Sequence, residues 1–149
     1  MAPAAFRTKL TLVGLLASSS LCIAASPRAT GEPSLYERMG GAPTVAAVVD
    51  ELIDRTSGDP KLKRSFDGVS LDHVKKMLTE QLCSLTGGGC TYSGDSMKDV
   101  HAGHGIDQAE FYGMVEILRD TLRRHGVALR ERNELLAILA PMKRDVVER

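Results

Sequence analysis

The chain has 149 residues, enough for one domain of ordinary size and too few for two. Hydrophobic residues make up 43% and charged residues 26%, as in a typical globular protein, and 19 basic side chains balance 19 acidic ones. We do not expect a nucleic-acid partner, because phosphates favour a basic surface. Aromatic residues make up only 4%, so the core must be aliphatic or be completed by something flat and unsaturated.

The N-terminal stretch has the pattern of a secretory signal. A basic start with Arg7 and Lys9 precedes a short apolar run and then a series of small residues. The apolar run is too short for a membrane span of about 20 residues. We therefore expect residues 1–25 to be removed on export, to the periplasm of a bacterium. Two alternatives are an N-terminal anchoring helix and lipid attachment at Cys22, which the large Leu21 before it disfavours.

Residues 26–33 contain two prolines and a glycine and are expected to form a linker, so that the folded domain covers 34–149. Two cysteines of this domain, Cys83 and Cys90, flank a glycine-rich turn at 86–89. In an oxidising compartment such a pair is expected to form a disulfide. Closing so short a loop stabilises the fold by roughly 2.5 kcal/mol in the chain-entropy estimate. The alternative is two free thiols.

Apolar residues recur at helical spacing and no strand pattern stands out, so the expected fold class is all-α. Pro141 should kink the last helix or distort one of its turns. The expected helices, in chain order, cover 35–39, 43–57, 71–85, 107–125 and 135–146, with a short turn-like piece around Leu62 and Phe66.

The helix expected at 71–85 has one apolar face, and the segment 91–105 has little periodicity at all. The apolar face is formed by Leu71, Val74, Met77, Leu78, Leu82 and Leu85, with His73 and Gln81 expected to lie off it. About 15 residues without regular structure need a reason, and wrapping one side of a cofactor is one. This segment holds His101 and His104. From the residues alone, His101 is either a solvated loop histidine, a metal ligand together with His104, or a cofactor ligand.

Several short motifs follow one another in a specific order between residues 35 and 147. They are LYERMGG at 35–41, DPKL at 59–62 followed by Phe66, the glycine pair at 87–88, YSG at 92–94, MKDVHAG at 97–103, and APM at 140–142 followed by Asp145 and Val146. This order and spacing resemble the group I truncated haemoglobins. The resemblance implies a two-over-two helical sandwich around haem b. It aligns His101 with the proximal iron ligand and Phe66 with a phenylalanine that packs on the macrocycle, while Leu82 and Met97 are further expected cofactor contacts.

On the distal side the chain departs from the pattern of this family. Ile53 stands where many members have tyrosine, Leu78 stands where many have glutamine, and Val74 occupies the nearby gate position. The usual hydrogen-bond donors to bound oxygen are therefore missing. A charge-assisted hydrogen bond contributes about 1.5–3 kcal/mol, so without one we expect fast oxygen release and ready oxidation of the iron.

Met77 aligns with a position from which some family members send a histidine to the iron. A thioether there could bind haem iron, but we expect Met77 to remain unbound and the distal site to be open or water-filled in the ferric form. The leading functional hypothesis is reversible binding of a diatomic gas. The alternatives are an enzyme that detoxifies nitric oxide or peroxide, an electron-transfer protein with an unidentified redox partner, and a haem-free helical interaction module.

Overall fold

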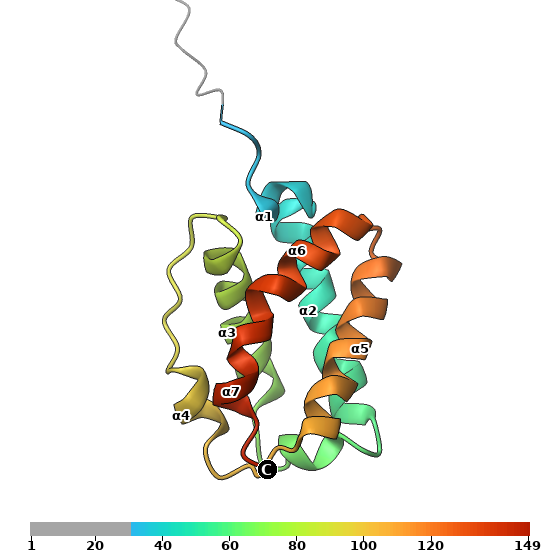
Figure 1. The fold of residues 1–149 in the computed structure, drawn as a ribbon. Coiled ribbons are helices and arrows are strands. Elements are labelled where there is room, and N and C mark those ends of the chain that lie inside the picture. The colour runs from blue at the N-terminus through green and yellow to red at the C-terminus, as the bar shows by residue number, and fades with distance from the viewer. Residues whose placement is uncertain (1–30) are drawn as a thin grey trace, which may run out of the picture. The chain divides into compact units, whose positions relative to one another are not determined.

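The computed structural model describes residues 31–149, so the expected signal and the first part of the expected linker lie outside the described residues. All regular secondary structure in this part of the chain is helical, as the periodicity predicts. The elements are α1 (Leu35–Arg38), α2 (Gly41–Gly58), η1 (Lys63–Phe66), α3 (Leu71–Leu85), α4 (Met97–His101), α5 (Gln108–Arg124), α6 (Leu129–Leu139), η2 (Ala140–Met142) and α7 (Lys143–Val146) (Figure 1).

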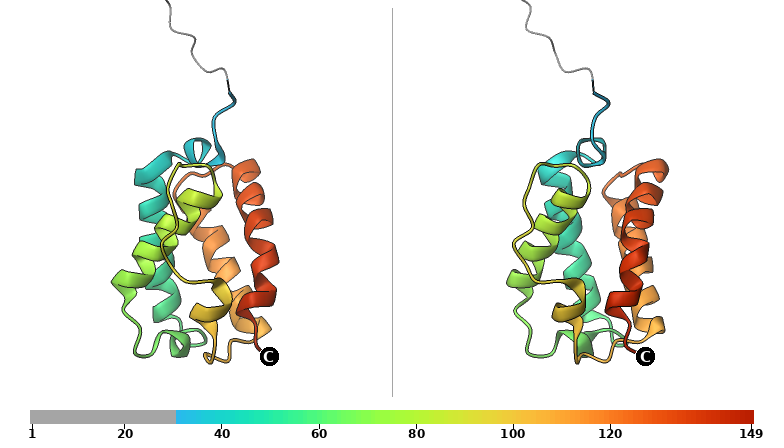
Figure 2. Two further views of the ribbon diagram at one scale, coloured as in Figure 1. Left: turned by 90° about the vertical axis from the view of Figure 1, so that its left-hand side faces the viewer. Right: turned by 60° about the vertical axis from the view of Figure 1, so that its left-hand side comes forward.

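The helices of residues 31–149 form two layers. Helices α2 and α3 make one pair, and α5 makes a second pair with α6 and its continuation through η2 into α7 (Figure 2). Helix α2 packs against both α3 and α5, which joins the layers. None of these helices has the length and apolar character that crossing a bilayer requires.

Local sequence signals explain where several helices begin and break. Asp107 starts α5 with a reciprocal capping box: its carboxylate accepts from the Glu110 N–H at 2.9 Å, and the Glu110 carboxylate accepts from the Asp107 N–H at 3.0 Å. Ser70 caps α3 by accepting from the His73 N–H. Pro141 lies within the 3-10 turn η2 that separates α6 from α7, so the expected distortion of the last helix is confirmed.

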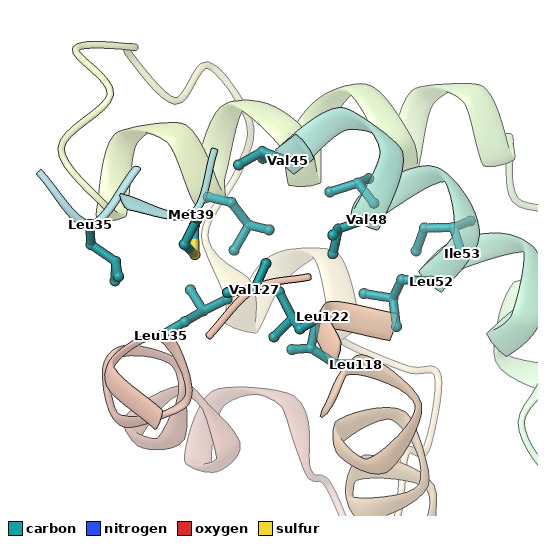
Figure 3. Packing of buried hydrophobic residues seen from close by; sticks show 12 residues of the cluster. Leu35, Met39, Val45, Val48, Leu52, Ile53, Leu118, Leu122, Val127 and Leu135 are labelled. Carbon is teal, nitrogen blue, oxygen red and sulfur yellow. The ribbon is translucent and has the colours of Figure 1, made fainter. Parts of the chain in front are cut away.

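The core is a contiguous aliphatic cluster contributed by α1, α2, α3, α5, α6 and the residues between α5 and α6 (Figure 3). Ile53 and Leu135 have no exposed surface at all. The buried hydrophobic members are Leu35, Met39, Val45, Val48, Val49, Leu52, Ile53, Leu82, Leu118, Leu122, Val127 and Leu135.

Two expectations about the chain between α3 and α5 are wrong. Leu85 is 37% exposed rather than part of the apolar face, because it ends α3 where the chain turns away into the glycines. The segment 91–105 is not irregular throughout, since residues 97–101 form helix α4. Ser96 caps this helix by accepting from the Asp99 N–H at 3.2 Å, and its one aliphatic residue, Val100, is exposed. Periodicity cannot reveal so short a helix without a buried stripe.

Candidate functional site

A cavity of about 590 Å³ lies among the helices. Its lining comes from every helical element except α1, and from the segments that join α3 to α4 and α4 to α5. Its volume is within the range of about 300–1,000 Å³ that is usual for ligand and cofactor sites. Most of the lining side chains are apolar. The structure brings together in this lining all eight residues expected to contact a cofactor, namely Ile53, Phe66, Val74, Met77, Leu78, Leu82, Met97 and His101.

His101 is the last residue of α4 and is half-buried against the cavity. Its Nδ1 lies 2.7 Å from the carbonyl oxygen of Met97, one helical turn earlier. A carbonyl can only accept, so in the neutral form of the ring Nδ1 carries the proton and Nε2 has a free lone pair. Such an arrangement, with one nitrogen held by a backbone carbonyl and the other free, is typical of histidines that bind a metal.

The wall formed by α2 and α3 offers few free hydrogen-bond donors to the cavity. Ile53, Val74 and Leu78 supply only apolar surface. The hydroxyl of Thr56 donates to the Leu52 carbonyl at 2.7 Å, and the Gln81 amide donates through Nε2 to the Met97 sulfur at 3.2 Å. Each of these polar groups therefore already has a partner within the protein.

The expectation that Gln81 and His73 lie off the apolar face of α3 is wrong, because both residues line the cavity. Gln81 is only 8% exposed. It follows Leu78 by three residues, and residues three or four apart share one face of a helix. Met77 and Leu78 both reach the lining as well, so the cavity-facing strip of α3 is wider than a single row.

A disulfide joins Cys83, at the end of α3, to Cys90, in the chain that leads to α4. Cys83 is buried and Cys90 is exposed. Just beyond Cys90, the residues 92–95 form part of the cavity lining. Ser93 donates to the Glu80 carboxylate from both its hydroxyl, at 2.7 Å, and its backbone N–H, and these bonds lower the pKa of Glu80. The disulfide and Glu80 thus hold this part of the cavity wall against α3.

A pair of charged residues in η1 and α5 did not stand out in the sequence. Glu110 lines the cavity and is buried, and one of its carboxylate oxygens pairs with the guanidinium of Arg64. Its Oε1 is buried without a hydrogen-bond partner among residues 31–149. The capping-box pattern at Asp107 accounts for the place of Glu110 in the helix but gives no signal for its contact with Arg64.

The helix arrangement, the large apolar cavity and the histidine with a free Nε2 define a helical protein built to enclose a cofactor. The family model of the bacterial-like globins matches residues 34–148. A group 1 truncated hemoglobin of Mycolicibacterium paratuberculosis is 31% identical over 113 residues, which are 76% of this chain and 83% of that protein.

Solved structures of truncated hemoglobins also resemble this chain. A truncated hemoglobin of Tetrahymena pyriformis, in its Fe(III) form, superposes with a TM-score of 0.74 at 27% identity and covers 78% of this chain and 100% of its own. A 2/2 hemoglobin from Synechococcus sp., in the cyanomet state and with covalently attached heme, gives a TM-score of 0.72 at 25% identity, with the same coverage. The chain therefore belongs to the bacterial-like globin family, within the group 1 truncated haemoglobins, and its fold is their two-over-two helical sandwich.

The cavity fits the haem that this family implies. It is large and mostly apolar, as the body of a porphyrin requires, and His101 presents a nitrogen lone pair at its border. In a chain with 4% aromatic residues, a flat unsaturated cofactor also supplies the bulky group that the core otherwise lacks.

Proposed function

We propose that the protein holds haem b through His101 and reversibly binds a diatomic gas, which is oxygen, nitric oxide or carbon monoxide. The observation that carries the proposal is the bond between His101 Nδ1 and the Met97 carbonyl, which orients the ring and leaves Nε2 as its only free ligand atom. Haem, when bound, supplies the iron at which the gas is taken up. Phe66 packs beside it as an apolar contact from η1.

The wall of the cavity formed by α2 and α3 determines how tightly the gas is held. Ile53, Val74 and Leu78 exclude water but donate no hydrogen bond. The Thr56 hydroxyl is engaged with the Leu52 carbonyl. Oxygen gains more from a nearby donor than carbon monoxide does, so this wall favours fast oxygen release with little effect on carbon monoxide. It also argues against nitric oxide or peroxide detoxification, because chemistry on an O–O bond is assisted by polar groups close to the distal oxygen.

The test is an optical and resonance Raman study of the purified full chain and its His101→Gly variant. We expect the wild type to bind haem and to show an iron–histidine stretch in the ferrous state, and the variant to lose both. Added imidazole should restore the spectrum of the variant, because it replaces the missing ring. His104→Ala is the matched control, since His104 also lines the cavity. Retention of an unchanged iron–histidine stretch in His101→Gly would contradict the proposal.

Met77 supports a second candidate function, electron transfer by a six-coordinate haem. Its thioether lines the cavity beside Leu78, and a thioether ligand raises the reduction potential of haem iron. A ferric near-infrared charge-transfer band that disappears in Met77→Leu would favour this function over gas binding. It would also call for a redox partner, whereas an open or water-filled ferric site would favour gas binding.

We further propose that the protein acts in an oxidising compartment outside the cytoplasm, in a bacterium the periplasm. The signal-like pattern of residues 1–25 and the Cys83–Cys90 disulfide both support this location. Mass spectrometry of the protein from its native host should find an N-terminus near Ser26 and no free thiol at either cysteine. An intact N-terminus with two free thiols would refute it.

A further inference from the structure

The five residues after His101 join α4 to α5 and are called here the 102–106 loop. Two of them, Gly103 and Gly105, have left-handed backbone angles, with φ of 82° and 59°. Glycine adds conformational freedom, so this loop has little stiffness of its own. Helix α4 is only five residues long, and a helix of that length is not stable by itself. Contacts from elsewhere must therefore hold His101 in place.

Residues near the C-terminus form hydrogen bonds with the backbone of the 102–106 loop, some as acceptors and some as donors. The Glu148 carboxylate accepts from the Gly103 N–H at 2.7 Å and also from the Gly105 N–H, while the Glu148 N–H donates to the Ile106 carbonyl at 2.9 Å. The Arg149 guanidinium donates to the Gly105 carbonyl through Nε at 3.0 Å. The chain end lies beside this loop in Figure 1. The backbone N–H groups of Gly103 and Gly105 lower the pKa of Glu148, in keeping with an ionised carboxylate there.

Arg64, which lies in η1, forms hydrogen bonds with the same loop. Its guanidinium donates to the His104 carbonyl at 3.0 Å and to the Gly105 carbonyl at 2.8 Å, and it pairs with the buried Glu110. The His104 N–H in turn donates to the His101 carbonyl at 3.2 Å. A continuous chain of hydrogen bonds thus runs from η1 and from the chain end to the backbone of His101.

We propose that Glu148, Arg149 and Arg64 are positioning residues for His101, which fix the 102–106 loop so that the imidazole keeps one orientation toward the cavity. This inference rests on the proposed role of His101 as haem ligand. The three residues act through the backbone of the loop, and none of them supplies a ligand atom. Charge-assisted hydrogen bonds to backbone groups are stronger than neutral ones, so these contacts can stiffen a loop that contains two glycines.

The test compares Glu148→Gln with Glu116→Gln in the haem-loaded full chain. A glutamine at 148 loses the negative charge, and its amide nitrogen cannot accept from a loop N–H. Glu116 is a matched control, because its side chain is 75% exposed and its ion pair with Arg119 is 3.7 Å long. A second variant, Arg64→Lys, keeps the positive charge but cannot reach two carbonyls with one planar fork.

Three readouts separate positioning from general stability. In Glu148→Gln and in Arg64→Lys we expect a shifted or broadened iron–histidine stretch and haem transfer to apomyoglobin that is about tenfold faster, as for other partners that orient a metal ligand. Amide exchange at Gly103 and Gly105 should rise as well. Glu116→Gln should match the wild type in all three, and a loss of thermal stability alone would not shift the stretch.

The outcomes also separate this inference from the proposed function. If His101→Gly abolishes the iron–histidine stretch while Glu148→Gln and Arg64→Lys leave both the stretch and the rate of haem loss unchanged, His101 is the ligand and the positioning role is wrong. If the stretch survives in His101→Gly, the proposed function is wrong and the positioning role is overturned with it.

Discussion

One intrahelical hydrogen bond determines which nitrogen of His101 can act as a ligand. The acceptor is the Met97 carbonyl, so the bond depends on the α4 backbone and not on another side chain. No substitution at position 97 can remove this carbonyl. As long as α4 is intact, this carbonyl stays in place to hold the ring, so the contacts that hold α4 are the points at which mutation can act.

The residue at position 53 should control oxygen release. We expect Ile53→Tyr to slow oxygen dissociation about tenfold or more, because one hydrogen bond to the bound gas is worth at least about 1.4 kcal/mol. Ile53 is fully buried and lines the cavity, so a phenol there points into the site. Stopped-flow measurement of oxygen dissociation checks the prediction, with carbon monoxide dissociation as an internal reference that should change less.

Gln81 provides the matching control for that experiment. Its amide already donates to the Met97 sulfur, so Gln81→Leu should leave oxygen release nearly unchanged. Faster release in Gln81→Leu would show that the amide turns toward the gas, so that Gln81 would supply a donor from the wall formed by α2 and α3.

Gly88 marks a position where any side chain would collide with the disulfide. A Cβ there would lie 2.6 Å from the Cys83 sulfur and 2.8 Å from the ring of Tyr36. We expect Gly88→Ala to destabilise the protein by about 1–3 kcal/mol, the usual cost of overpacking. Gly58→Ala is the control, because a Cβ at that position meets nothing within 4 Å. Equal free energies of unfolding for the two variants in urea titrations would refute the explanation.

At the scale of elements, the disulfide connects helix α3 to the wall segment that leads to α4. We expect the double variant Cys83→Ser/Cys90→Ser to lose about 2.5 kcal/mol of stability, since its unfolded chain is no longer closed into a short loop. Backbone amides of residues 91–96 should exchange faster, while those of α5 remain protected. Denaturant titration and hydrogen exchange measure the two effects, and reduction of the wild type should reproduce both.

The long helices could be predicted from the sequence, whereas helix α4 and the residues that contact the 102–106 loop could not. The apolar spacing of α2 and α5 and the capping signals at Ser70 and Asp107 are local, so they are visible along the chain. Helix α4 has no buried stripe and was not predicted as a helix. The family resemblance placed His101 among the expected cofactor contacts. The contacts of Arg64 and Glu148 with the 102–106 loop could not be predicted, because they join residues about 40 positions apart and no local sequence pattern indicates them.

At the scale of the whole molecule, several surface carboxylates should make the free energy of unfolding depend on pH. The pKa of Asp120 is lowered by hydrogen bonding to Arg123 and then to Arg55, and that of Glu80 is lowered chiefly by the Ser93 hydroxyl. A carboxyl whose pKa is lower in the folded state stabilises the fold above its unfolded pKa of about 4. That contribution is lost as the pH falls through the lower, folded value.

We therefore expect the free energy of unfolding to fall less steeply between pH 6 and pH 3 in Asp120→Asn than in the wild type. The exposed Asp67 makes no side-chain hydrogen bond or ion pair within residues 31–149, so Asp67→Asn is the control and should follow the wild type. Urea titrations at several pH values give the slopes. Parallel curves for wild type and Asp120→Asn would show that the Asp120 ion pairs contribute nothing to the acid sensitivity.

The interior consists of a packed aliphatic cluster and a large cavity, and only the cluster is filled by the protein's own side chains. Val45, Val48 and Leu135 pack in the aliphatic cluster (Figure 3), whereas residues of α4 line the cavity and do not belong to that cluster. Without its cofactor, the protein should thus keep one cooperative folded half and open locally at the other, so that haem completes the hydrophobic interior as its last component. Because such a ligand binds only the folded chain, the melting temperature should rise with free haem concentration, each tenfold excess over the dissociation constant adding about 1.4 kcal/mol.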